Sequence, residues 1–354
     1  MNSKKRVLSA FAREPHDRVP IDFSTNEVIC GKLIKHLGVS TYEDLLKAFN
    51  VDFRGIGAPY AGKLIYEELP GMTVDPIYGH YTKWVENSYG GYWDFCHFPL
   101  QGADSEQVMN FPVPSPDDFD YSNVLAEVKS KGEYALFCGS AGMADVINST
   151  GRVMGMEDTL VNLITGDEAT MCYIEKRMNM QLGILERIID SAQGGIDFLW
   201  IGEDLGTQRS PMISRELYKS ALMPIHKRYV DLAKSRGLPV MVHTCGCSSW
   251  AYEDFIEMGV DAVDTLQPEA ENMSPKYLVE NFGGRLSFHG CISTAGALAS
   301  GGTSDVREEV REVLEVMKPT RAYMLAPTHQ IQDNSPVENV IELYRSAIEL
   351  GKYD

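Results

Sequence analysis

The sequence is poor in basic residues, in cysteine and in long apolar runs. Among its 354 residues, 32 are Lys or Arg and 50 are Asp or Glu, so the formal net charge is −18. Such a chain has little with which to neutralise phosphates, which argues against nucleic acid and anionic membrane surfaces as partners. The sequence contains no run of about 18 apolar residues that could span a bilayer. Residues 1–20 lack the apolar stretch of a signal peptide.

The 7 cysteines are an odd number and are spread thinly over the chain. This distribution is not typical of a disulfide framework. We therefore expect a cytoplasmic protein in a reducing environment, whose thiols stay free for metal binding or for chemistry.

One pattern recurs along the chain: a short apolar run, a polar or small residue at its end, and then a helical stretch. The apolar runs are continuous, as expected of parallel strands buried on both faces. Eight of them predict a (β/α)8 barrel; a doubly wound open sheet is the main rival, but no G-x-G-x-x-G follows the first strand. The predicted strands are 18–24, 51–60, 134–140, 197–206, 239–246, 262–268, 286–291 and 322–329, and the clearest helices are 214–237, 248–259, 303–319 and 335–351.

Two long insertions, 61–133 and 141–196, follow the second and third predicted strands. Inside the first, residues 80–100 predict an aromatic hairpin with Gly90–Gly91 at its turn, and residues 118–132 predict a helix. We expect residues 1–354 to form a single barrel domain, with a partly β insertion at about 61–117 that covers the barrel mouth.

The ends of the predicted strands carry most of the reactive side chains. In barrels of this class, chemistry takes place at the C-terminal ends of the strands, so this coincidence favours an enzyme. The residues at these ends are Asp22, Tyr60, Cys138, Glu203, Asp204, His243, Cys245, Gln267, His289, Cys291 and His329.

His243 and Cys245 are the first candidates for a metal site, because residues i and i+2 of a strand point the same way. Zn²⁺ suits a mixed nitrogen and sulfur site, and a catalytic zinc takes three protein ligands and leaves one position open. The spacing alone equally allows a buried histidine beside an inert buried cysteine. A third ligand would come from elsewhere, and the candidates are His329, Cys291, Glu203 and Cys247.

The chain resembles the uroporphyrinogen decarboxylase superfamily over nearly its whole length, and within it the zinc-dependent, corrinoid-linked methyltransferases. The segments that carry the resemblance are "DRVPIDFS" (17–24), "GEDLGTQRSPMISRELYKSALMPIHKR" (202–228), "VMVHTCG" (240–246), "VDTLQPEAENM" (263–273), "FHGCIST" (288–294) and "YMLAPTHQIQDNSPVENV" (323–340). The resemblance implies a (β/α)8 barrel with its site at the C-terminal mouth.

In the methyltransferase branch, zinc is held by a His-x-Cys pair and by a Cys after the final strand. His243 and Cys245 match the pair, but His329 stands where that third Cys is expected. This departure leaves open whether His329, Cys291 or Glu203 completes the set. The decarboxylase branch also has a His in this region, but its N-terminal segment is rich in Arg, and here no Arg lies between Val19 and Arg54.

The resemblance leads us to expect methyl transfer between a small methylated compound, or a thiol, and a corrinoid carried by a partner protein, with Zn²⁺ as the metal. The alternatives are a cofactor-independent decarboxylase and a barrel that binds a small molecule without turnover. A homodimer is compatible with the sequence. Under the first hypothesis Glu203, Asp204 and His329 act in catalysis, while Asp22, Tyr60, Gln267 and His289 contact the substrate.

Overall fold

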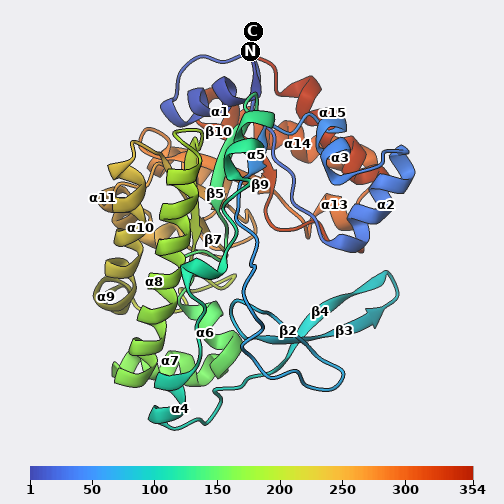
Figure 1. Ribbon diagram of the computed structural model, residues 1–354. Coiled ribbons are helices and arrows are strands. Elements are labelled where there is room, and N and C mark those ends of the chain that lie inside the picture. Colours follow the sequence, from blue (N-terminus) through green and yellow to red (C-terminus); the bar gives the residue numbers. More distant parts are fainter. Residues whose placement is uncertain (354) are drawn as a thin grey trace.

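A curled sheet of seven parallel strands forms the centre of the computed structural model, which describes residues 1–353 (Figure 1). The strands follow one another in the sheet in chain order, as in a TIM-like barrel. They are β1 (Phe53–Gly55), β5 (Ala135–Gly139), β6 (Phe198–Gly202), β7 (Val240–Thr244), β8 (Ala262–Thr265), β9 (Ser287–Ile292) and β10 (Tyr323–Pro327).

The predicted strand 18–24 is not a regular strand. Ile21 makes one isolated parallel bridge with Leu325 of β10, and the N–H of Asp22 donates to the Leu325 carbonyl at 2.9 Å. On its other side, the Ile21 carbonyl accepts from the N–H of Asp52, just before β1, at 2.8 Å. Because Pro20 has no N–H to give to a ladder, this segment bridges the two edge strands without forming a full strand.

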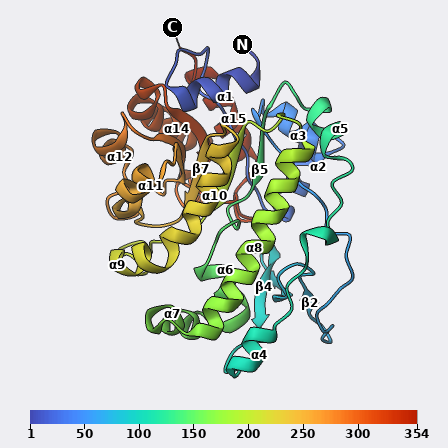
Figure 2. The same cartoon turned by 60° about the vertical axis from the view of Figure 1, so that its left-hand side comes forward.

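Helices pack around the outside of the sheet, and Figure 2 shows α8 and α10 side by side along this surface. Their apolar residues recur at helical spacing and are buried, as for Val306, Val310 and Val313 of α14. The helices are α1 (Ser3–Ala12), α2 (Glu27–Leu37), α3 (Tyr42–Ala48), α4 (Ser105–Asn110), α5 (Val124–Ser130), α6 (Ile147–Met154), α7 (Met156–Thr165), α8 (Glu168–Ser191), α9 (Arg215–Leu217), α10 (Met223–Ser235), α11 (Tyr252–Met258), α12 (Pro275–Phe282), α13 (Ala297–Ser300), α14 (Thr303–Met317) and α15 (Val337–Leu350).

The two ends of the barrel are covered differently. Helix α1 covers the end near both termini, where Val7 and Phe11 pack against Phe53 and Phe198. The opposite end carries α6, α7 and a three-stranded antiparallel sheet (Figure 1) of β2 (Thr73–Val74), β3 (Tyr81–Asn87) and β4 (Gly90–His97).

The hairpin expected over 80–100 is formed by β3 and β4. Its turn lies at Ser88 and Tyr89, two residues earlier than expected, and the side-chain oxygen of Asn87 accepts from the N–H groups of Tyr89 and Gly90. Gly90 and Gly91 then begin β4. None of the helices in residues 1–353 combines the length and the apolar character needed to cross a membrane.

Candidate metal centre

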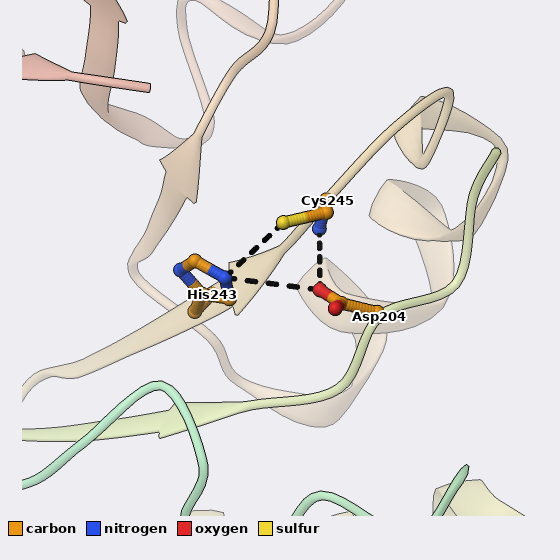
Figure 3. Close-up of side chains that lie close together, drawn as sticks. All are labelled: Asp204, His243 and Cys245. Atoms are coloured by element: carbon orange, nitrogen blue, oxygen red, sulfur yellow. Dashed lines mark hydrogen bonds and ion pairs between the residues drawn. The ribbon is translucent and has the colours of Figure 1, made fainter. Parts of the chain in front are cut away.

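Asp204, His243 and Cys245 bring three different metal-binding atoms together where β6 and β7 end (Figure 3). The Cys245 sulfur lies 3.4 Å from Nε2 of His243. Oδ1 of Asp204 lies 3.7 Å from the same nitrogen and accepts the backbone N–H of Cys245 at 2.9 Å. Within residues 1–353, this is the only group of three or more His, Cys, Asp or Glu side chains close enough to share one ion.

The backbone after β7 explains why Cys245 is held in place. Gly246 has a φ of +71°, and a Cβ on it would lie 2.3 Å from the carbonyl oxygen of Gly206. Only glycine fits this close approach without displacing the neighbouring loop. The N–H of Gly246 donates to Oε1 of Gln267 at 2.7 Å. Gln267, which we expected to contact substrate, therefore supports the loop that carries Cys245.

A chain of hydrogen bonds runs from His243 across the strand ends. Nδ1 of His243 lies 2.7 Å from Oδ2 of Asp264 and 2.8 Å from the hydroxyl of Thr265. The other oxygen of Asp264 lies 2.6 Å from Nδ1 of His289, and Nε2 of His289 lies 3.2 Å from Asp22. Since Asp264 occupies Nδ1 of His243, it leaves Nε2 directed at Cys245 and Asp204.

Each charged group in this series of hydrogen bonds stabilises the charged form of its neighbour. Burial alone would lower the pKa of His289, but the charge of Asp264 and the hydrogen bonds to Asp22 and Asp264 raise it to about 9. Burial also opposes the charged form of His243, yet the bond to Asp264 holds its pKa well above the ordinary value. Despite burial, the charges of both imidazoles keep the pKa of Asp264 well below its usual range. Asp264 is therefore an ionised carboxylate between two imidazoles.

The donor set of this site fits zinc. An imidazole nitrogen, a thiol and a carboxylate are all ligands that Zn²⁺ takes in proteins. A histidine whose second nitrogen is bonded to a carboxylate is the usual arrangement around such a metal. Burial raises the pKa of the Cys245 thiol, and its contact with His243 works against that rise.

A cavity of about 830 Å³ lies over the strand ends. Asp22, Asp204, His243, His289 and His329 all line it, so five of the predicted site residues face one space. The cavity is large enough for a drug-sized ligand. His329 follows β10 and lies outside the three-residue group. Burial and the nearby charge of His243 lower its pKa.

Two predicted site residues lie away from this cavity. Cys291 is fully buried and lines a separate pocket of about 410 Å³ together with Glu269 and Glu309. Tyr60 donates its hydroxyl to the carbonyl of Lys63 at 2.7 Å and is absent from the cavity wall. The structure therefore does not bring Cys291 or Tyr60 to the candidate metal centre.

Glu203 is buried next to Asp204 and does not line the cavity. Its two oxygens accept the backbone N–H groups of Val146 and Ile147 at 2.7 and 3.1 Å, and Nε2 of His226 lies 3.3 Å away. Burial raises the pKa of Glu203 to about 7. These contacts fix the start of α6. Asn148, the second residue of that helix, donates to Oδ2 of Asp204 at 2.7 Å.

Asp264, Thr265 and Asn148 were missed as site residues. Asp264 does carry a signal in the sequence, because it interrupts the apolar run of a strand expected to be buried on both faces. A carboxylate in such a position needs a partner. No comparable signal marks Asn148, which reaches Asp204 only through the fold.

Taken together, the strand order and the clustered side chains define an α/β protein of the TIM-barrel type with a candidate metal centre at the carboxyl ends of its strands. The family model described as uroporphyrinogen decarboxylase (URO-D) matches residues 147–350. The chain belongs to this family, which confirms the resemblance seen in the sequence.

Among solved structures, a methyltransferase from Methanosarcina mazei superposes with a TM-score of 0.67 at 16% identity, over 99% of each chain. This similarity supports the fold over the whole length. Two further structures are more distant. A dihydropteroate synthase from Xanthomonas albilineans with 4-aminobenzoic acid has a TM-score of 0.32 at 15% identity, over 50% of this chain and 60% of that chain. A D-psicose 3-epimerase in the presence of D-fructose has a TM-score of 0.37 at 11% identity, over 70% of this chain and 84% of that chain. No curated protein sequence matches the chain.

Proposed function

We propose that the protein is a zinc-dependent methyltransferase of the uroporphyrinogen decarboxylase superfamily. It would move a methyl group between a small methylated compound, or a thiol, and a corrinoid carried by a partner protein. The observation that supports this most is the group formed by Asp204, His243 and Cys245, of which Asp204 and His243 line the cavity. A decarboxylase that needs no metal gives no reason for such a group.

His243 and Cys245 would hold the metal through Nε2 and Sγ, with Asp204 or His329 as the further ligand. When bound, zinc would supply Lewis acidity toward a leaving group, or lower the pKa of a thiol. Asp264 orients the imidazole of His243, and Asn148 orients the carboxylate of Asp204. Glu203 is assigned a positioning role, because its oxygens are occupied by the backbone at the start of α6.

A cofactor-independent decarboxylase is the second candidate, and the family match itself favours it. Arg54 and Arg152 line the cavity and could face a carboxylated substrate. Arg54, however, is already paired with Glu43 at 2.8 Å. A substrate with many carboxylates would therefore meet few free cations in this cavity.

The deciding experiment is elemental analysis of protein purified without chelator, beside the variants Cys245→Ala and Cys172→Ala. Cys172 lies on α8 and is the matched control, because it is a free, partly buried cysteine like Cys245 but lies outside the group of metal-binding side chains. We expect about one zinc per chain in the parent and in Cys172→Ala, and loss of zinc in Cys245→Ala. Stoichiometric zinc in Cys245→Ala would refute the ligand assignment, and porphyrinogen decarboxylation that survives a chelator would favour the second candidate.

A further inference from the structure

Arg152 is a cavity cation without a counter-ion. It lies on α6 and lines the cavity, but its side chain makes no ion pair and no hydrogen bond with residues 1–353. The other two Arg or Lys side chains in the cavity wall differ in this respect: Arg54 pairs with Glu43 at 2.8 Å, and Lys131 pairs with Glu127 at 2.7 Å. A half-buried guanidinium is stabilised by a carboxylate or phosphate, which its planar fork binds through two parallel hydrogen bonds.

The carboxyl group that could serve Arg152 from within the chain is engaged elsewhere. Asp145 lines the same cavity, but its oxygens accept the N–H of Asn148 at 3.0 Å and the hydroxyl of Ser149 at 2.8 Å. Burial and the charge of Glu203 raise the pKa of Asp145 to about 8. The charges of Arg152 and Arg177 work against this rise, and no ion pair joins Asp145 to Arg152 in the described residues.

The position of Arg152 is fixed relative to the metal centre. Asn148 and Arg152 are four residues apart on α6 and so lie on one face of the helix, about 6 Å apart along its axis. Asn148 bonds directly to Asp204 of the candidate metal centre. The guanidinium lies 5.0 Å over the ring of Phe95 from β4, and His80 stacks on the same ring with centroids 5.4 Å apart. Arg152 thus lies about one helical turn along α6 from the residue that contacts Asp204, and its guanidinium packs on a ring of the three-stranded sheet.

We propose that Arg152 binds an anionic group, a carboxylate or a phosphate, of the molecule that occupies this cavity. The inference rests on the proposed function in one respect: the other end of that molecule is taken to lie at the metal centre. Two sources supply this chemistry, namely a carboxylate on the small methylated compound and the phosphodiester of the corrinoid. The binding of the anion itself needs neither metal nor turnover.

The test is isothermal titration of the protein with benzoate and with benzamide, which have similar shape but differ in charge. The variants are Arg152→Met and Arg152→Lys, with Arg311→Met as the control, since Arg311 forms its ion pairs on the outer surface of α14. We expect Arg152→Met to weaken benzoate binding by about 10- to 100-fold and to leave benzamide unchanged. Arg152→Lys should lose less, and Arg311→Met nothing.

A second titration distinguishes the two sources by comparing cobalamin with cobinamide, which lacks the phosphodiester and its nucleotide. A loss in Arg152→Met confined to cobalamin assigns the anion to the corrinoid, and a loss confined to benzoate assigns it to the small compound. Equal affinities of parent and Arg152→Met for both anions, or no binding of either by the parent, would overturn the proposal.

Repeating the benzoate titration with Cys245→Ala separates this inference from the proposed function. Binding that persists in Cys245→Ala and depends on Arg152 supports the anion site even where the zinc assignment fails. Binding that is lost in Cys245→Ala but retained in Arg152→Met places the carboxylate on the metal, and refutes the role of Arg152.

Discussion

The buried imidazole of His289 makes a strong prediction about stability. It lies between Asp264 and Asp22, at 2.6 and 3.2 Å, and its pKa is raised from an ordinary 6.5 to about 9. The folded protein therefore binds this proton more tightly than the unfolded chain. The resulting stabilisation is fully present below pH 6.5 and is lost as the pH rises through 9. A difference of two to three pKa units corresponds to roughly 3 kcal/mol.

The assay is urea unfolding, followed by circular dichroism between pH 6 and 10 on protein treated with a chelator. His289→Gln removes the titrating group, and His36→Gln, an exposed residue of α2, is the matched control. We expect the free energy of unfolding of the parent and of His36→Gln to fall by roughly 3 kcal/mol more than that of His289→Gln across this range. Parallel pH profiles for the parent and His289→Gln would refute the assignment of a charged His289.

Other substitutions test the framework of the site. Gly246→Ala should strongly reduce the zinc content, because the added Cβ would collide with a backbone oxygen. Gly237 is the control, since it has the same φ of +71° but open space around it. Gly237→Ala should lower the free energy of unfolding in urea by only about 1 kcal/mol and should retain the metal. Glu203→Gln should lower the free energy of unfolding by about 1 kcal/mol, because two backbone donors at the start of α6 lose a carboxylate acceptor; an unchanged urea midpoint would contradict this. Phe198→Ala should cost about 3–5 kcal/mol by the same assay, because its fully buried ring packs against α1, and a loss below 1 kcal/mol would show that α1 does not close the core.

Most of the fold could be predicted from the sequence because parallel strands buried on both faces have a simple pattern. Seven of the eight predicted runs contain a strand of the central sheet. The exception, 18–24, has the composition of a strand, but it makes only two backbone hydrogen bonds with Leu325 of β10 and accepts one from Asp52 on its other side. Hydrophobic pattern reports burial, and it does not report how many ladder hydrogen bonds a segment makes.

The site could be predicted only in part. His243 and Cys245 come together as expected, because the period of a strand places i and i+2 on one side. The same rule fails for Cys291, which has a φ of +71° and lines a different pocket. A left-handed residue inside a strand breaks the alternation of sides. The third neighbour in the group, Asp204, comes from another strand end, and only the register of β6 against β7 brings it there.

The irregular segment at residues 20–22 connects the stability of the barrel with the charge of the site. The buried carboxylate of Asp52 accepts from Arg6 at 2.6 Å, from Arg18 at 2.7 Å and from the N–H of Ile21 at 2.8 Å. Asp52 thus supplies the acceptor that a neighbouring strand would otherwise provide. The residue after Ile21 is Asp22, whose carboxylate contacts His289. His289 and His243 share Asp264. The ion pairs near the N-terminus therefore help to position the carboxylate of Asp22, which is linked to the candidate metal centre through His289, Asp264 and His243.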